Sequence, residues 1–259
     1  MQTFTNHTLE VNAIEYINGE MIASGGYDAT IYIWSLKSGS ITQGIYLETG
    51  VISLKLLVNG YDLAIGIQGG NIVIYNINDR TYVSSLTGHT NNVADLALIN
   101  NDLLASSSGD QTVRIWDLTT GVTKFLLTGH TSSVFGLKLV SSDILVSVSW
   151  DKTIKMWNIT NGNLLRSLSN HTDKIMWSVD SLCSQKSFVS GSSDQTIKEW
   201  DSITGVLINT ISTGLQIRAL TVLNITTVTT CKISNYFNLN YRVFSLRNKT
   251  YARNFYYQQ

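Results

Sequence analysis

Proline and cysteine are scarce in this chain. None of its 259 residues is proline, so its turns have to be built from Gly, Asn, Asp and Ser. Only two cysteines are present, Cys183 and Cys231, which makes a framework of disulfides implausible. The sequence therefore fits a reducing compartment, the cytoplasm or the nucleus.

An excess of charge is missing as well. Eighteen basic and eighteen acidic residues cancel, so nothing global suggests a polyanionic partner such as nucleic acid. No apolar run approaches the roughly 18 residues that a membrane-spanning helix needs. The first residues lack the basic start and the apolar run of a secretory signal. We therefore expect neither a nucleic-acid partner nor a membrane partner.

Four segments share a recurring set of residues, which we call the quartet. A His is followed 21 to 23 residues later by an Asp, with a Ser four residues before that Asp and a Trp six residues after it. The four quartets are His7, Ser24, Asp28 and Trp34; His89, Ser106, Asp110 and Trp116; His130, Ser147, Asp151 and Trp157; and His171, Ser190, Asp194 and Trp200.

The quartets recur at a nearly constant interval. Trp116 and Trp157 are 41 residues apart, Trp157 and Trp200 are 43 apart, and Trp34 and Trp116 are 82 apart, which is two periods. A period of about 40 to 45 residues is typical of a repeat architecture in which each unit is one supersecondary element.

Each period contains four short apolar runs. In residues 88–128 the runs are rich in β-branched and aliphatic residues and are separated by Asn, Asp, Gly and Thr turns, which predicts a four-stranded antiparallel meander. The period between the first two quartets keeps this rhythm but has Glu48, Gly69 and Tyr75 at the His, Asp and Trp positions. We interpret it as a degenerate repeat.

Two dipeptide pairs carry a resemblance to a known family. Gly88-His89 with Trp116-Asp117, and Gly129-His130 with Trp157-Asn158, resemble WD repeats, and the spacing extends this likeness over nearly the whole chain. The resemblance implies an all-β fold, a single β-propeller domain of about six four-stranded antiparallel blades. The ring is either complete or an incomplete fragment. The expected blades are residues 5–47, 48–87, 88–128, 129–169, 170–212 and an eroded 213–259.

The same resemblance implies a role for the quartet. In the family, the Asp accepts a hydrogen bond from the His, the His bonds the Ser, and the Ser bonds the Trp indole. The rival interpretation is a Ser-His-Asp hydrolase triad. A catalytic constellation is needed once, whereas this one occurs four times, and no Gly-x-Ser-x-Gly elbow, metal-ligand cluster or phosphate-binding glycine loop is present. We favour a structural brace, with no catalytic residue, metal or cofactor.

Family contact positions lie three and five residues after the His and directly before the Asp. Because the fifth blade has two extra residues between its His and its Asp, Trp177 is an alternative to Met176 there. The candidate partner-binding residues on these positions are Glu10, Asn12, Tyr27, Asn92, Phe135, Trp150, Lys174, Met176 and Trp177.

Trp150 is the most informative of these candidates. Its equivalents before the other quartet Asp residues are Tyr27, Gly109 and Ser193, so the scaffold does not require an aromatic residue there. A tryptophan on a turn is a candidate binding anchor, with Phe135 beside it, because binding hot spots are rich in Trp, Tyr and Arg. With Tyr27, Met176 and Trp177 it would form an apolar patch; the alternative is that it lies flat over a neighbouring loop.

The expected function is a non-enzymatic interaction scaffold that presents loop residues to a protein or peptide partner. One alternative is the sensor or adaptor portion of a larger regulatory protein. Another is an enzyme with a site in the central channel, which would require convergent carboxylates or imidazoles that the repeat alignment does not place together.

Residues 236–259 differ in texture from the rest of the chain. They are rich in Tyr and Phe, with four basic and no acidic residues. Three interpretations stay open: an eroded sixth blade, the point where a longer repeat array was truncated or lost its reading frame, or a basic aromatic segment for nucleic acid or membrane.

Overall fold

A computed structural model of the chain describes residues 4–173, 176–182, 186–217, 220–224, 231–235 and 242–245. These residues form antiparallel strands and turns, with no helix among them. The described part accordingly contains no helix with the length and apolar character to cross a membrane. The chain divides into two compact units, Met1–Gly129 and His130–Gln259, and each is described by itself.

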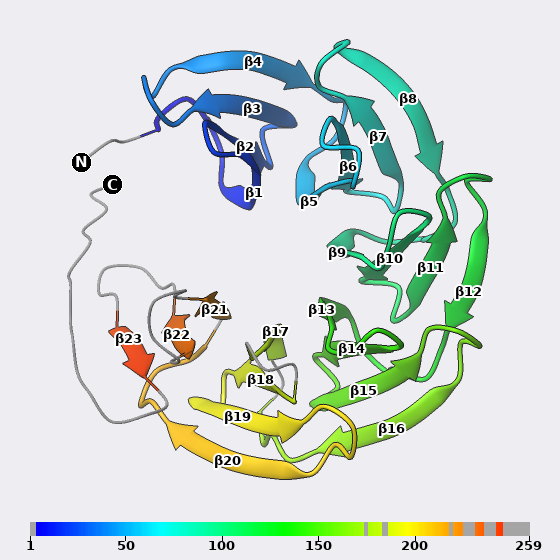
Figure 1. Cartoon of the computed structure of the whole chain (residues 1–259), viewed down its shortest axis with the longest axis vertical. Helices are drawn as coiled ribbons and strands as arrows, with labels where there is room; N and C mark the ends of the chain where they lie inside the picture. The colour runs from blue at the N-terminus through cyan, green and yellow to red at the C-terminus, as the bar shows by residue number, and fades with distance from the viewer. Residues whose placement is uncertain are drawn as a thin grey trace. The chain divides into compact units, whose positions relative to one another are not determined.

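The first unit contains three four-stranded sheets, which we call the first, second and third blades (Figure 1). In each blade the strands lie in chain order, and each pairs antiparallel with the next. Their bounds are β1 Val11–Asn18, β2 Met21–Gly26, β3 Thr30–Ser35 and β4 Ile41–Tyr46; β5 Val51–Leu56, β6 Asp62–Ile67, β7 Ile72–Asn76 and β8 Thr81–Leu86; β9 Val93–Leu98, β10 Leu103–Ser108, β11 Val113–Asp117 and β12 Thr123–Leu127. The opening strands pack against each other, β1 against β5 and β5 against β9.

The second unit contains the fourth and fifth blades and a three-stranded sheet. Their bounds are β13 Val134–Leu139, β14 Ile144–Ser149, β15 Thr153–Asn158 and β16 Leu164–Ser169; β17 Met176–Ser181, β18 Ser187–Ser192, β19 Thr196–Asp201 and β20 Leu207–Ser212; β21 Leu220–Asn224, β22 Cys231–Asn235 and β23 Arg242–Ser245. The strands of each sheet fall within one of the six expected blade ranges. Apart from β23, residues 236–259 lie outside the described part, and so do the interpretations of that segment.

Alternation along the strands explains why the sheets pack in layers. In β11, Val113 and Ile115 are fully buried whereas Arg114 between them is only partly buried. Successive strand residues point to opposite faces, so a period of two separates the apolar face from the polar one. Trp116, also fully buried, places the quartet at the end of this strand.

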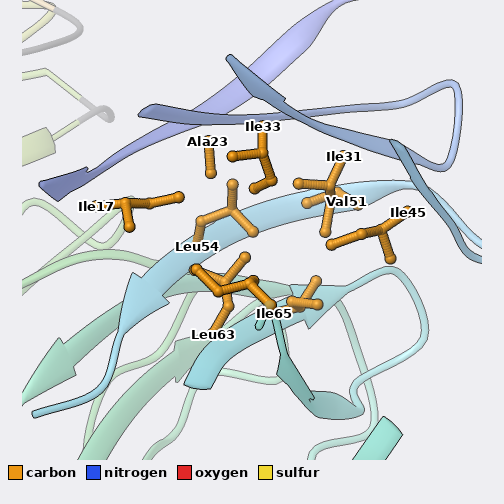
Figure 2. Packing of buried hydrophobic residues seen from close by; sticks show 10 residues of the cluster. Ile17, Ala23, Ile31, Ile33, Ile45, Val51, Leu54, Leu63 and Ile65 are labelled. Atoms are coloured by element: carbon orange, nitrogen blue, oxygen red, sulfur yellow. The ribbon is translucent and has the colours of Figure 1, made fainter. Parts of the chain in front are cut away.

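The apolar faces of the first and second blades form one core (Figure 2). Ile31 and Ile33 from β3 lie in this cluster with Val51 and Leu54 from β5 and with Ile65 from β6. Burying a side chain of this size contributes roughly 1.5–3 kcal/mol. Packing of one sheet against the next therefore holds the first unit together.

The second blade has an apolar residue where the other blades have the quartet Ser. Ile65 is the fourth residue of β6 and is fully buried, as Ser106 is in β10. With Glu48 and Tyr75 at the His and Trp positions, a buried hydroxyl there would lack its usual partners. An unpaired buried polar group costs roughly 1–3 kcal/mol. A serine at this position would therefore destabilise a blade that lacks the quartet His and Trp, which explains why the second blade lacks all four quartet residues together.

In the second blade, Gln68 links the loop before the first strand to the turn after the second strand, which the His–Asp pair links in the other blades. The Gln68 backbone N–H donates to the Gly50 carbonyl at 3.0 Å. In return the Gly50 N–H donates to Gln68 Oε1 at 3.2 Å. These bonds tie the loop before β5 to the turn after β6, so the degenerate blade keeps its connection without a quartet.

One recurring turn, which relies on the quartet Asp, places a residue other than glycine in the left-handed conformation. The residue after each quartet Asp has a positive φ between 60° and 72°, and it is an alanine, glutamine or lysine: Ala29, Gln111, Lys152 and Gln195. Non-glycine residues rarely adopt this left-handed conformation. The Asp side chain accounts for the exception, because it accepts a hydrogen bond from the backbone N–H two residues later and so holds the turn.

Candidate functional site

The quartet of the third blade is a continuous chain of hydrogen bonds. His89 Nδ1 lies 2.7 Å from Asp110 Oδ2. On the other side of the ring, His89 Nε2 lies 2.7 Å from Ser106 Oγ. The Trp116 indole N–H donates to the same Ser106 oxygen at 2.7 Å. The hydrogen bonds follow the predicted connectivity and join the loop before β9 to β10, to the β10–β11 turn and to β11.

The other three quartets repeat this geometry. In all four, His Nδ1 lies 2.7–3.0 Å from the Asp carboxylate. His Nε2 lies 2.7–2.8 Å from Ser Oγ, and the Trp indole lies 2.7–2.9 Å from that oxygen. Four copies of one network in different blades indicate a part of the scaffold.

The direction of each hydrogen bond follows from the groups involved. An indole N–H can only donate and a carboxylate can only accept. The Ser oxygen therefore accepts from Trp and donates its own hydrogen to His Nε2, which leaves the proton on Nδ1 for the Asp. This is the neutral imidazole tautomer with both nitrogens satisfied.

Sequence reasoning missed a fifth member of the network. A threonine stands two residues after every quartet Asp, and its hydroxyl donates to the carboxylate at 2.6–2.7 Å: Thr30, Thr112, Thr153 and Thr196. A second threonine directly follows each His, and its backbone N–H donates to the same carboxylate at 2.8–3.1 Å: Thr8, Thr90, Thr131 and Thr172. The recurring patterns His-Thr and Asp-x-Thr were the signal that could have revealed them.

The seryl oxygens are poorly placed for nucleophilic chemistry. Ser106, Ser147 and Ser190 are fully buried, and Ser24 is 7% exposed. Each oxygen is already bonded to a His and a Trp, so a substrate carbonyl could approach it only if the network broke. Among the described residues, moreover, no group of three or more His, Cys, Asp or Glu side chains is arranged to hold a metal ion.

The carboxylates of the network have lowered pKa values. Burial alone would raise the pKa of Asp28, but the hydrogen bonds that it accepts, the largest from Thr30, lower it from 3.8 to about 2. The pKa values of Asp110, Asp151 and Asp194 are lowered for the same reasons. Burial also lowers the pKa of His171 from 6.5, because it disfavours the imidazolium more than Asp194 favours it.

These shifts predict that acid destabilises the fold. A carboxylate with a lowered folded-state pKa stabilises above its unfolded value of 3.8, and this contribution is lost as pH falls towards 2. The lowered pKa of His171 acts in the same direction below pH 6.5, where the unfolded chain takes up the proton first. The free energy of unfolding, measured from pH 8 to pH 2, should fall monotonically below pH 6.5. An Asp110→Asn variant should show a smaller loss below pH 4; parallel curves for the two proteins would contradict the shift at this residue.

The structure brings two of the predicted partner-binding residues together. The rings of Phe135, in β13, and Trp150, in the β14–β15 turn, are stacked with centroids 4.4 Å apart and an interplanar angle of 24°. Both side chains are partly exposed, and the Trp150 backbone N–H donates to the Ser133 carbonyl at 3.0 Å. The fourth blade therefore presents a paired aromatic surface next to its quartet.

In the first unit, two candidates are engaged within the scaffold. The Asn12 amide donates to the Val51 carbonyl at 2.9 Å, which joins the first blade to the second. Asn92 Oδ1 accepts from the Gly69 N–H at 3.3 Å, which joins the third blade to the second. Sequence reasoning did not anticipate these bonds between blades, because they depend on how neighbouring repeats pack.

Two further candidates of the first unit are exposed. Tyr27 is 39% exposed, and its ring lies so close to Gly50 that a β-carbon there would come within 3.1 Å of it. Glu10 is exposed as well. Lys174 and the side chains of Met176 and Trp177 lie outside the described part of the chain, so the predicted patch around Trp150 stays a prediction for them.

Comparison with known proteins assigns this chain to a family. The family model described as "WD domain, G-beta repeat" matches residues 1–35, 80–117, 121–158 and 162–201, more than half of the chain. The chain therefore belongs to the WD40 repeat family. The matches leave out most of the degenerate second blade and everything after residue 201.

A solved structure supports the same architecture. The WD40 β-propeller domain of Doa1 matches with a TM-score of 0.73 and 20% sequence identity, over 90% of this chain and 81% of that one. At this identity the likeness shows the fold, a β-propeller of four-stranded antiparallel blades. No curated protein matches the chain. Propellers of this family generally serve as scaffolds for protein interactions.

Proposed function

We propose that this chain is a non-catalytic scaffold that holds a protein or peptide partner through the stacked pair of Phe135 and Trp150. The observation that carries the proposal is the stack itself, with centroids 4.4 Å apart on a rigid blade. Two members of the fourth-blade quartet flank the pair in the sequence: His130 precedes Phe135, and Asp151 directly follows Trp150. A 2.7 Å hydrogen bond joins His130 to Asp151 and so positions the pair.

The fold does not need an aromatic pair at these two positions. The corresponding residues are Ala94 and Gly109 in the third blade, and Asn12 with Tyr27 in the first. A preassembled pair of rings offers a large apolar contact surface and loses little side-chain entropy when a partner binds. Partly exposed aromatic clusters of this kind are where binding energy concentrates.

The arrangement of the quartets supports the non-catalytic part of the proposal. Their seryl oxygens are buried and hydrogen-bonded on two sides, and the same network occurs in four blades. Loops carried by rigid sheets are instead well suited to recognition. A partner held at the aromatic pair would meet the side of the blade where the quartet stiffens the turn.

The pair predicts a selective loss of binding. Trp150→Ala should weaken partner binding by about 2 kcal/mol, or about thirtyfold in Kd, because it removes half of the stacked surface. Proteins captured by the immobilised wild-type chain would be identified and then titrated against the wild type, Trp150→Ala and Phe135→Ala.

A matched control separates binding from folding. Tyr46→Ala removes an aromatic ring that is 74% exposed on β4 and should leave binding unchanged. Thermal melting of Trp150→Ala should stay within a few degrees of the wild type, since the ring is only partly buried. Equal affinity of all four proteins for the partner would refute the proposal.

A further inference from the structure

A cavity of about 410 Å³ lies between the second and third blades of the first unit. It continues the apolar core that these two blades share. The wall residues that belong to this core or pack against it are Leu57, Ile74, Leu86 and Leu118. Val58 and Val83 also line the cavity, and they are 55% and 50% exposed. The uncovered end of the shared core is therefore an apolar surface that is open to solvent, which is typical of interaction sites.

The cavity exists because one strand of the second blade carries a serine at a position where the other four-stranded blades have a longer side chain. Ser84 of β8 lines the cavity and pairs with Ile74 of β7. Directly paired residues share one face of a sheet, so Ser84 lies on the face that Ile74 turns towards the core. The same register places at this position in the other blades Gln43, Phe125, Arg166 and Asn209.

Two of these longer side chains reach the next blade. The Gln43 amide donates to the Tyr75 hydroxyl at 3.5 Å and so links the first blade to the second. Arg166 Nε donates to the Ile203 carbonyl at 3.4 Å, which links the fourth blade to the fifth. A serine side chain ends one atom beyond its β-carbon. Ser84 is therefore too short to fill the corresponding space between the second and third blades.

Two turn glycines show independently that the packing is looser here. Gly205 lies in the β19–β20 turn, and a β-carbon added to it would come within 2.8 Å of Leu168 Cδ2 in the preceding blade. Gly121 has the same place in the β11–β12 turn, and a β-carbon there would be 3.8 Å from Leu86 Cδ2, its nearest neighbour. Leu86 and Leu168 are themselves equivalent in register. The third blade thus leaves a gap against the second, whereas protein interiors are normally close-packed.

The polar side chains at the β5–β6 end of the cavity are used within their own turn. The Asn59 amide donates to Asp62 Oδ2 at 2.7 Å. Asn59 Oδ1 in turn accepts from the backbone N–H groups of Tyr61 and Asp62, at 3.2 and 2.9 Å. An occupant of the cavity would therefore be held mainly by the apolar wall.

We propose that this cavity is a second binding site, which takes an aromatic side chain from a partner polypeptide. The ring would lie over Ser84, between Ile74 of the second blade and Leu118 of the third. A flat ring suits a space between two packed sheets, and a phenylalanine, Phe125, stands at the equivalent position of the next blade. The site is separate from the aromatic pair in the second unit and does not depend on the function proposed for that pair.

A titration with small probes tests the site directly. N-acetyl-phenylalanine methylamide would be added to the full-length chain with ¹³C-labelled Leu and Val methyl groups, and N-acetyl-alanine methylamide serves as the analogue without a ring. The methyl signals of Leu57, Val83 and Leu118 should shift with the phenylalanine probe. This probe should bind at least about tenfold more tightly than the alanine probe, because its ring leaves water.

A substitution that supplies the ring from within the chain tests the cause of the cavity. Ser84→Phe should fill the space, weaken binding of the phenylalanine probe at least about tenfold, and raise the Tm by about 2 °C. Ser85→Phe is the matched control, because it adds the same ring to the opposite face of β8. It should leave the binding of the probe unchanged.

The outcomes that would contradict the proposal are distinct. Equal binding of the alanine and phenylalanine probes, or shifts confined to methyl groups outside the cavity, would overturn it. An equal loss of binding in Ser84→Phe and Ser85→Phe would do the same. If Ser84→Phe does not fold, the wild-type shift map and the preference for the ring decide by themselves. Benzyl alcohol has the ring but no peptide groups, so binding as tight as that of the phenylalanine probe would overturn the assignment to a polypeptide.

Discussion

Asp110→Ala should lower the free energy of unfolding by about 3 kcal/mol, because it removes the acceptor that several donors of a buried hydrogen-bond network share. The Asp110 carboxylate accepts hydrogen bonds from the His89 ring, the Thr112 hydroxyl and two backbone N–H groups. The alanine variant would leave these donors unpaired and release the Gln111 turn, whose left-handed backbone depends on them. For a chain of this size the loss corresponds to a fall in Tm of about 6–12 °C.

A second acid in the same blade provides the comparison. Asp102 is exposed at the end of the β9–β10 turn, directly before β10, and its side chain has no counterpart to the Asp110 network. Asp102→Ala should change the free energy of unfolding by less than about 0.5 kcal/mol. Chemical denaturation of both variants measures the difference; a free energy of unfolding for Asp110→Ala within about 0.5 kcal/mol of that for Asp102→Ala would show that the network does not brace the blade.

Ile65→Ser should destabilise the chain by about 4 kcal/mol, although it introduces the residue that the other blades have at this position. The change removes a fully buried aliphatic side chain, which costs roughly 2 kcal/mol. It also buries a hydroxyl without the His and Trp partners that satisfy Ser106, at a cost of roughly 2 kcal/mol more. A serine is stabilising only as part of the complete network.

The conservative control is Ile65→Val, which should cost about 1 kcal/mol because it deletes a single methylene group. Urea denaturation with equal m-values for the wild type and both variants would confirm that stability alone has changed. If Ile65→Ser were as stable as Ile65→Val, the quartet Ser would not depend on its partners, and the cooperative interpretation of the network would fail.

Much of the fold was predictable because the same residue pattern recurs in four of the repeats. Each quartet marks the loop before the first strand, the second strand and the third, so the spacing alone locates the blades. The bonds that His89 makes to Ser106 and Asp110 were likewise predictable from the family resemblance. Thr112 was overlooked because threonine is common in strands, and its position relative to the Asp gains meaning only when the turn geometry is known.

The candidate sites differ in how far sequence could locate them. Trp150 and Phe135 stand at fixed distances from the quartet, so alignment of the repeats was enough to place them side by side. The acceptor of the Asn12 amide could not be located in this way, because it belongs to the next blade. Periodicity describes one repeat at a time, whereas this hydrogen bond joins two repeats.

A double-mutant cycle between Asp110 and Trp116 tests most directly whether each quartet is one structural network. Trp116→Phe removes the indole N–H that Ser106 accepts, and Asp110→Ala removes the opposite end of the chain of hydrogen bonds. We expect a coupling free energy of about 1 kcal/mol or more from the unfolding of the two single variants, the double variant and the wild type. Additive effects, within about 0.5 kcal/mol, would contradict a connected brace.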